Sequence, residues 1–390
     1  MNASEPVYLD YAATTPVDPA VTEAMCRVLS DSSSFANPAS IHIAGRVAHA
    51  RVEHARRQLA GLLRTAPRAL IFTSGATESA NLAILGAARF RAHRGRHLVT
   101  MRTEHKAVTD TFVALEKAGY EVTWLAPDRD GVLALGDLEA AIREDTQLVS
   151  IMHVNNETGV IQDIHEIGAC CRRRGVLFHC DAAQSAGKLP LNLSELPVDL
   201  LSLTAHKFHG PQGIGALYLA DRPDCHILPI LHGGGQERHL RPGTLAVHQV
   251  VGLGAAAALA AERQGEDLAH SRSLNERLWR GIRDLPGVRR NGSESCSFPG
   301  ILNVAIDGIE GESLLLDLEP VCVASGSACN SQSGESSSVL RALGLDDRLA
   351  QSAIRFSFGR FTRQSDIDTA VERYVAAVGH LRGIMPAKVA

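Results

Sequence analysis

The sequence has little net charge and no long apolar run. A formal net charge of −4 over 390 residues gives no electrostatic case for direct binding to nucleic acid or to an anionic membrane surface. Met1–Asp10 lacks the basic and apolar regions of a signal peptide, and runs such as Ala255–Ala261 are too short to span a bilayer. These absences predict a cytoplasmic protein without a membrane partner.

The cysteines do not form a recognisable disulfide or zinc pattern. Eight cysteines in a chain of this length do not resemble a disulfide framework, and no two have C-x-x-C spacing. We therefore expect reduced thiols and no intrinsic metal. Cys329 differs from the other seven because it lies in the small-residue stretch Ser325–Ser331. We interpret the other seven as inert and expect the loop around Cys329 to be mobile, so that its thiol can attack.

Apolar strands alternate with amphipathic helices through the first half of the chain. This alternation predicts an α/β fold with a mostly parallel sheet flanked by helices, followed by a smaller α/β C-terminal domain. We place the large domain at 16–262 and the small domain at 1–15 and 263–390. The predicted strands are 69–73, 97–100, 121–125, 148–154, 176–180, 200–204 and 216–219, then 301–306, 321–325 and 353–358.

Two of these strands lead into charged residues of opposite sign. Asp181 follows one strand and Lys207 follows the next. Pyridoxal phosphate requires such a pair, because the lysine forms a Schiff base with the aldehyde and the aspartate keeps the ring nitrogen protonated. Gln184, one helical turn after Asp181, would donate to the phenolic oxygen of the ring. Helix capping is the alternative role for Asp181.

The stretch Phe72–Glu78 joins a strand to a helix and contains small residues. Backbone amides at such a junction can face a phosphate, and Thr77 can add a hydroxyl. A simple N-cap with a glycine turn is the alternative. Because ligands of parallel sheets gather beyond the carboxyl ends of the strands, we expect this junction to lie near Asp181 and Lys207.

Three further polar positions accompany strands. His105, between a strand and a helix, can stack on the cofactor ring and transfer protons. One amide of Asn155 and Asn156 can reach the cofactor oxygen or the substrate, and an Asx turn explains the pair equally well. Arg355, in an apolar strand, suits a bidentate substrate carboxylate or an internal ion pair.

In this order, these motifs resemble the cysteine desulfurases of the NifS/IscS type, which are class V, fold-type I pyridoxal-phosphate enzymes. The resemblance implies a homodimer with shared active sites, L-cysteine as the substrate, and a sulfur-acceptor or scaffold protein as the partner. The matching strings are Tyr8–Pro16, Asn37–Ser40, Thr73–Ser79, Thr103–Val108, Met152–Glu157, His232–Glu237 and Ser325–Cys329.

The resemblance also implies a role for each candidate residue. Lys207 would form the Schiff base, His105 would stack on the ring as an acid and base, and Cys329 would become a persulfide as alanine is released. Asp181 and Gln184 would hold the ring, and Asn156 would contact the cofactor and the substrate. Arg355 would hold the substrate carboxylate. The phosphate would be held by Ala76, Thr77, Thr204 and His206, with Thr244 reaching the phosphate of the other subunit.

Two departures from the family pattern concern the phosphate site and the acceptor. Relatives usually carry Ser-Gly-His-Lys where this chain has Thr204–Lys207, and the threonine keeps the hydroxyl. Housekeeping relatives usually continue with a docking tail where this sequence ends at Ala390, so we expect that tail to be absent, and the loop 330–335 differs from theirs. Iron–sulfur assembly, nitrogenase maturation, tRNA thiolation and phosphorothioate DNA modification stay open, as does transient iron–sulfur ligation by Cys329.

Other functions remain to be distinguished from a desulfurase. A selenocysteine lyase or an aminotransferase would share the fold, although an aminotransferase has no use for a mobile thiol. A docking subunit that has lost catalysis is the alternative from another class. The joint presence of Lys207, His105, Asp181 and Cys329 favours the desulfurase.

Overall fold

The computed structural model describes residues 6–32, 35–325 and 336–384, and its largest sheet has seven strands. The strand order is β2-β8-β7-β6-β5-β3-β4, and β8 runs antiparallel to both of its neighbours. The other pairings are parallel, which confirms the mostly parallel sheet. The strands are β2 (Leu70–Thr73), β3 (His97–Met101), β4 (Glu121–Leu125), β5 (Thr146–Ser150), β6 (Leu177–Asp181), β7 (Leu200–Thr204) and β8 (Gly215–Leu219).

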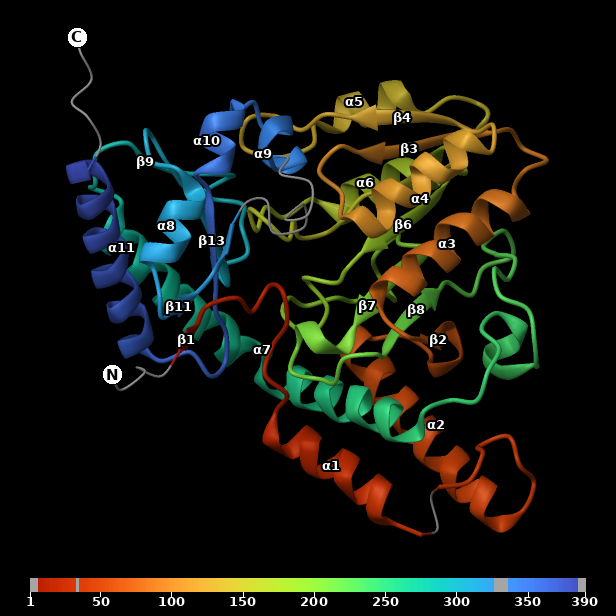
Figure 1. The fold of residues 1–390 in the computed structure, drawn as a ribbon. Helices are drawn as coiled ribbons and strands as arrows, with labels where there is room; N and C mark the ends of the chain where they lie inside the picture. Colours follow the sequence, from red (N-terminus) through yellow and green to blue (C-terminus); the bar gives the residue numbers. More distant parts are fainter. Residues whose placement is uncertain (1–5, 33–34, 326–335, 385–390) are drawn as a thin grey trace.

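Burial explains why these segments form a sheet. Every residue of β3, β5, β6 and β7 is buried, as expected for parallel strands covered on both faces. Helix α3 packs across the inner strands, while α1 and α2 each pack against α7 (Figure 1). The helices around this sheet are α1 (Pro19–Ser30), α2 (Ile43–Leu63), α3 (Ala76–Phe90), α4 (Lys106–Lys117), α5 (Leu135–Ala141), α6 (Ile164–Arg173) and α7 (Val247–Ile282).

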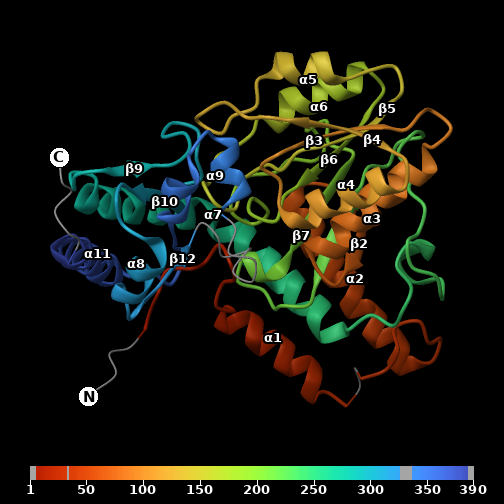
Figure 2. The same cartoon turned by 45° about the horizontal axis from the view of Figure 1, so that its top comes forward.

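A second, antiparallel sheet has the order β12-β13-β10-β9 and its own apolar core around Leu302, Phe356 and Tyr374. Figure 2 shows α7 extending from the large sheet to this smaller one. The strands are β9 (Val288–Arg290), β10 (Ile301–Ile306), β12 (Ala324–Ser325) and β13 (Ile354–Ser357), and the helices are α8 (Gly311–Asp317), α9 (Ser338–Ala342), α10 (Asp347–Gln351) and α11 (Gln364–Ile384). β1 (Val7–Tyr8) pairs in parallel with β11 (Val321–Cys322).

Several sequence predictions need correction. The strand predicted at 148–154 ends at Ser150, and the strand predicted at 321–325 is two short strands in different sheets. The residues after Asp181 form turns rather than a helix. Cys26 and Cys322 are exposed, so burial does not explain their predicted inertness. The domain boundary at 262 stays a prediction, and α7 is continuous through it.

Buried ion pairs connect segments that lie far apart in the sequence. Arg360 bonds Asp18 at 2.8 Å and Asp267 at 2.8 Å, and so joins the chain after β13 to the start of α1 and to α7. Arg56 of α2 bonds Glu237 through both terminal guanidinium nitrogens, at 2.9 and 2.7 Å. A Glu237 oxygen also accepts from the Phe72 amide at 2.7 Å, which satisfies a donor of the edge strand β2. Among the described residues, no helix combines the length and apolarity needed to cross a membrane.

Removal of Glu237 should destabilise the fold strongly. Only 3% of its side chain and 10% of that of Arg56 are exposed, so Glu237→Ala leaves a buried charge without its bidentate partner. We expect the free energy of unfolding in urea to fall by about 3–5 kcal/mol. Asp221→Ala, which removes the partner of the exposed Arg68, is the matched control and should cost about 1 kcal/mol or less. Equal losses in the two variants would contradict this account.

Glu157 should make stability depend on pH. Its carboxylate accepts from the Ser337 hydroxyl at 2.5 Å, and burial raises its pKa from 4.5 to about 7. In the folded state the buried carboxyl is favoured in its protonated form. The stabilisation that this form contributes is complete below pH 4.5 and is lost as the pH rises through about 7. A glutamine side chain at this position cannot titrate. The stability of Glu157→Gln relative to the parent should therefore rise by about 2–3 kcal/mol between pH 5 and pH 8, as measured by urea unfolding. A pH-independent difference would be inconsistent with this pKa.

Candidate active site

A cavity of about 560 Å³ lies beyond the carboxyl ends of β2, β5, β6 and β7. The N-terminal segment and β13 complete its wall through Asp10, Ala12 and Arg355. Ten residues predicted from the sequence line it, although they come from distant parts of the chain: Ala76, Thr77, His105, Asn156, Asp181, Gln184, Thr204, His206, Lys207 and Arg355.

Lys207 ends a short 3-10 helix that directly follows β7. Its ammonium donates to the carbonyl oxygens of Ala12 and Ala13, at 2.7 Å for Ala13. Both acceptors belong to the N-terminal segment, so this segment determines where the amine of the predicted Schiff-base lysine lies.

Asp181 is the last residue of β6 and only 4% of it is exposed. One carboxylate oxygen accepts from the Ala183 amide at 2.9 Å, which is a local turn contact rather than a helix cap. Burial raises the pKa of Asp181, and the neighbouring His105 and Lys207 oppose this shift. A desolvated carboxylate of this kind is stabilised by a cationic partner in the cavity, such as a protonated pyridine nitrogen.

His105 is the N-cap residue of α4, and this position defines its tautomer. Its Nδ1 accepts from the Ala107 amide at 3.1 Å, so in the neutral ring the proton lies on Nε2. Burial lowers the pKa of His105, and the charge of Asp181 offsets part of that shift. The side chain of His105 is therefore a neutral imidazole, and its Nε2–H is the group that can donate a hydrogen bond.

The start of α3 forms an open anion cradle. Gly75 has φ +156°, and within the described chain no side chain caps the helix that begins at Ala76. The first-turn amides of Ala76 and Thr77 therefore remain for a phosphate. Glu78 bonds Arg241 at 2.9 Å, which compensates its negative charge near this site.

Thr204 and His206 lie beside this cradle. The Thr204 hydroxyl donates to the Ile214 carbonyl at 3.2 Å, and His206 Nδ1 lies 3.2 Å from the Thr14 hydroxyl. Burial, together with the charge of Lys207, lowers the pKa of His206 to about 4, so its ring is neutral at pH 7. A neutral His206 can donate one hydrogen bond to an anion from the ring nitrogen that carries the proton.

The two consecutive asparagines have different roles. Asn155 Oδ1 accepts from the amides of Glu157 and Thr158, at 2.9 and 2.8 Å, so the Asx turn belongs to Asn155. Asn156 lines the cavity, and its buried Oδ1 finds no hydrogen-bond partner in the described residues. An orphaned buried acceptor calls for a donor from a bound ligand. Only the three-dimensional structure could separate these two neighbours.

Of the two interactions predicted for Arg355, the internal ion pair is present, and the contact with a substrate carboxylate stays a prediction. One guanidinium nitrogen bonds Asp10 Oδ1 at 2.6 Å and another donates to the Asn156 carbonyl at 2.8 Å, so an internal ion pair exists. Nε is buried without a partner in the described part of the chain. Arg355 also lines the cavity, where it can meet a carboxylate.

Sequence reasoning missed Asp10 and Lys188. Asp10 pairs with Arg355 across 345 positions, and Lys188 donates to Gln184 Oε1 at 2.7 Å. The sequence offered one indication that Asp10 belongs to the site, its place in the motif Tyr8–Pro16, and offered none for Lys188. Thr244 is exposed and outside the cavity lining. Cys329 lies outside the described residues.

The residues present fit pyridoxal phosphate. The uncapped amides of α3 suit its phosphate, buried Asp181 suits its ring nitrogen, and the amine of Lys207 opens onto the same cavity. Among the residues that the structure describes, no cluster of His, Cys, Asp or Glu could hold a metal ion.

Comparisons with known proteins agree with this arrangement. The aminotransferase class-V family model matches residues 7–370. The cysteine desulfurase IscS of Salmonella schwarzengrund is 53% identical over 382 residues, which cover 98% of this chain and 95% of the relative.

Two solved structures are also similar. A NifS-like protein has a TM-score of 0.89 at 36% identity, with 96% of this chain and 100% of that one covered. SspA in complex with cysteine has a TM-score of 0.81 at 37% identity, with 91% and 99% covered. The chain therefore belongs to the class-V aminotransferase family and, within it, to the cysteine desulfurases.

Proposed function

We propose that this cysteine desulfurase binds L-cysteine in the cavity between Lys207 and Arg355 and passes the substrate sulfur to Cys329. The observation that carries the proposal is the convergence of Lys207, His105, Asp181 and Arg355 on one cavity. The bound cofactor, pyridoxal phosphate, supplies an electron sink that acidifies the α-proton and weakens the bond between β-carbon and sulfur.

The residues of the chain hold the reactants and move protons. The cavity amides of Ala76 and Thr77 anchor the phosphate, and Asp181 holds the ring nitrogen protonated. The Lys207 amine removes the α-proton of the substrate. His105 exchanges a proton at Nε2, because its Nδ1 is engaged by the Ala107 amide.

Sulfur transfer balances without an external oxidant. The Cys329 thiolate attacks the substrate sulfur, a sulfur–sulfur bond forms, and the carbon–sulfur bond breaks. The carbon fragment takes up protons and leaves as L-alanine, while Cys329 carries the persulfide. An acceptor or scaffold protein then receives this sulfur, for iron–sulfur cluster assembly or for another thiolation.

We further propose a homodimer with shared active sites. Phe35, Ile41 and Ile43 are 83, 91 and 74% exposed around the start of α2, an unusual position for large apolar side chains in a monomer. Thr244 is likewise exposed just before α7, where it can reach the phosphate bound by a second copy. The cytoplasmic location stays a prediction.

Replacement of Cys329 tests the reaction. Cys329→Ala should abolish alanine release from L-cysteine, because the sulfur has no acceptor, while the visible absorbance of the cofactor remains. Cys296→Ala removes an exposed thiol outside the proposed reaction and should leave turnover unchanged. Loss of this absorbance in Lys207→Ala would support an enzyme with a Schiff-base lysine over a docking subunit that has lost catalysis. Normal turnover by Cys329→Ala would refute the proposal.

Replacement of Arg355 tests substrate binding. Arg355→Ala should raise the KM for L-cysteine about 30- to 800-fold, since a desolvated carboxylate pair is worth about 2–4 kcal/mol. Cysteamine, which lacks the carboxylate, separates this contact from general damage to the site. The preference of the enzyme for L-cysteine over cysteamine, measured as a ratio of kcat/KM, should largely disappear in the variant. An unchanged ratio would rule out the assigned contact.

A further inference from the structure

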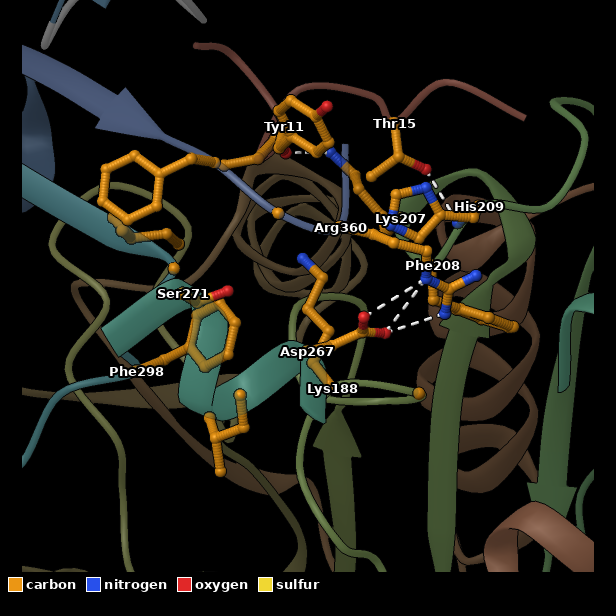
Figure 3. A pocket seen from close by; sticks show the side chains of 17 residues that line it. Tyr11, Thr15, Lys188, Lys207, Phe208, His209, Asp267, Ser271, Phe298 and Arg360 are labelled. Carbon is orange, nitrogen blue, oxygen red and sulfur yellow. Dashed lines mark hydrogen bonds and ion pairs between the residues drawn. The ribbon is translucent and has the colours of Figure 1, made fainter. Parts of the chain in front are cut away.

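A second, small cavity lies behind the active site and contains the side chain of Lys188 (Figure 3). Its volume is about 40 Å³, room for a few water molecules rather than for a substrate. It lies between the N-terminal segment, α7 and the smaller sheet, and Lys207 lines both cavities. Its other charged or titratable lining residues are Tyr11, His209, Asp267 and Arg360.

Lys188 is held in this cavity by a hydrogen bond to an amide rather than by a carboxylate of the described residues. Its Nζ donates to Gln184 Oε1 at 2.7 Å and lies 5.5 Å from the centre of the Phe298 ring. Asp267, the acidic residue lining the same cavity, is bonded to Arg360 at 2.8 Å. In the described parts of the chain no acid forms an ion pair with Lys188. Burial, together with the charges of Lys207 and Arg355, lowers the pKa of Lys188 to about 7.

The contact with Lys188 defines how the Gln184 amide is oriented. The ammonium form of Lys188 can only donate and the Ala12 carbonyl can only accept, so the amide oxygen faces Lys188 and the NH₂ group faces Ala12. The NH₂ group donates to the Ala12 carbonyl at 2.8 Å, the same oxygen that accepts from Lys207. One amide hydrogen then remains on a residue that lines the active-site cavity.

We propose that Lys188 is a positioning residue that orients the Gln184 amide, so that its remaining N–H is presented to the phenolic oxygen of the cofactor. This inference rests on the proposed cofactor contact of Gln184. It explains why a cation is kept near two other cations at a position where it has no ion-pair partner among the described residues.

Lys188→Met tests the proposal because it keeps the length of the side chain but removes the donor and the charge. In the reconstituted enzyme, we expect the Kd for pyridoxal phosphate to rise about tenfold, equivalent to one charge-assisted hydrogen bond. The pH midpoint of the cofactor's visible absorbance should rise by about one unit, because the phenolic oxygen loses a hydrogen-bond donor that stabilises its negative charge in the deprotonated chromophore. Lys117→Met, at the exposed end of α4, should change neither quantity.

A double variant distinguishes positioning from a general structural role. If Lys188 acts through Gln184, the Kd and the pH midpoint of Gln184→Ala/Lys188→Met should equal those of Gln184→Ala alone. Fully additive effects, or parental values in Lys188→Met, would overturn the proposal while the desulfurase reaction stands. Failure of the parent enzyme to bind pyridoxal phosphate would instead refute the proposed function.

Two further measurements control for an effect of the substitution on folding. Lys188→Met removes a desolvated charge, so its free energy of unfolding in urea should not fall below that of the parent. Lys188→Arg keeps a charged donor and should restore the absorbance midpoint toward the parental value. A Lys188→Arg midpoint equal to that of a folded Lys188→Met would also count against the positioning role.

Discussion

The active site depends on the backbone of the N-terminal segment, which connects the two larger sheets. Ser357 of β13 bonds the backbone on both sides of Tyr11: its carbonyl accepts from Tyr11, its amide donates to the Leu9 carbonyl, and its hydroxyl accepts from the Ala12 amide. Four residues later, the Thr15 amide donates to the His206 carbonyl. Between these anchors, the Ala12 carbonyl accepts from both Lys207 and Gln184. Through these hydrogen bonds, the N-terminal segment links the reactive amine of Lys207 to the smaller sheet.

Burial at the strand ends then determines the electrostatics of the site. β6 and β7 are buried along their whole length, so Asp181 and the residues after Thr204 emerge into a poorly solvated cavity. Burial disfavours the charged form of each ionisable group: it raises the pKa of Asp181 and lowers the pKa values of His105 and His206. The same scaffold that orders the residues therefore prepares two neutral imidazoles and a carboxylate that gains from a cationic partner.

The sequence predicted the parts of this arrangement that are locally encoded. Apolar runs that end in a polar residue located Asp181 and His105, because strand periodicity and strand termini are properties of adjacent residues. It could not predict the pairing of Arg355 with Asp10 or the contact of Lys188 with Gln184, since the first depends on chain closure over hundreds of positions and the second on a turn predicted as a helix. The predicted role of Thr244 concerns a second copy of the chain, which one sequence cannot place.

Helix α7 also has a consequence for how the molecule could be dissected. Its 36 residues extend about 54 Å as one continuous rod and contribute buried side chains to both larger cores, including Leu253 and Leu278. A protease or a gene truncation that cut the chain near residue 262 would therefore sever a helix, leaving each fragment with an apolar stripe that has lost its continuation. The fragments on either side of residue 262 are thus poorly suited to separate expression. A fusion or split-protein strategy would better use a surface turn.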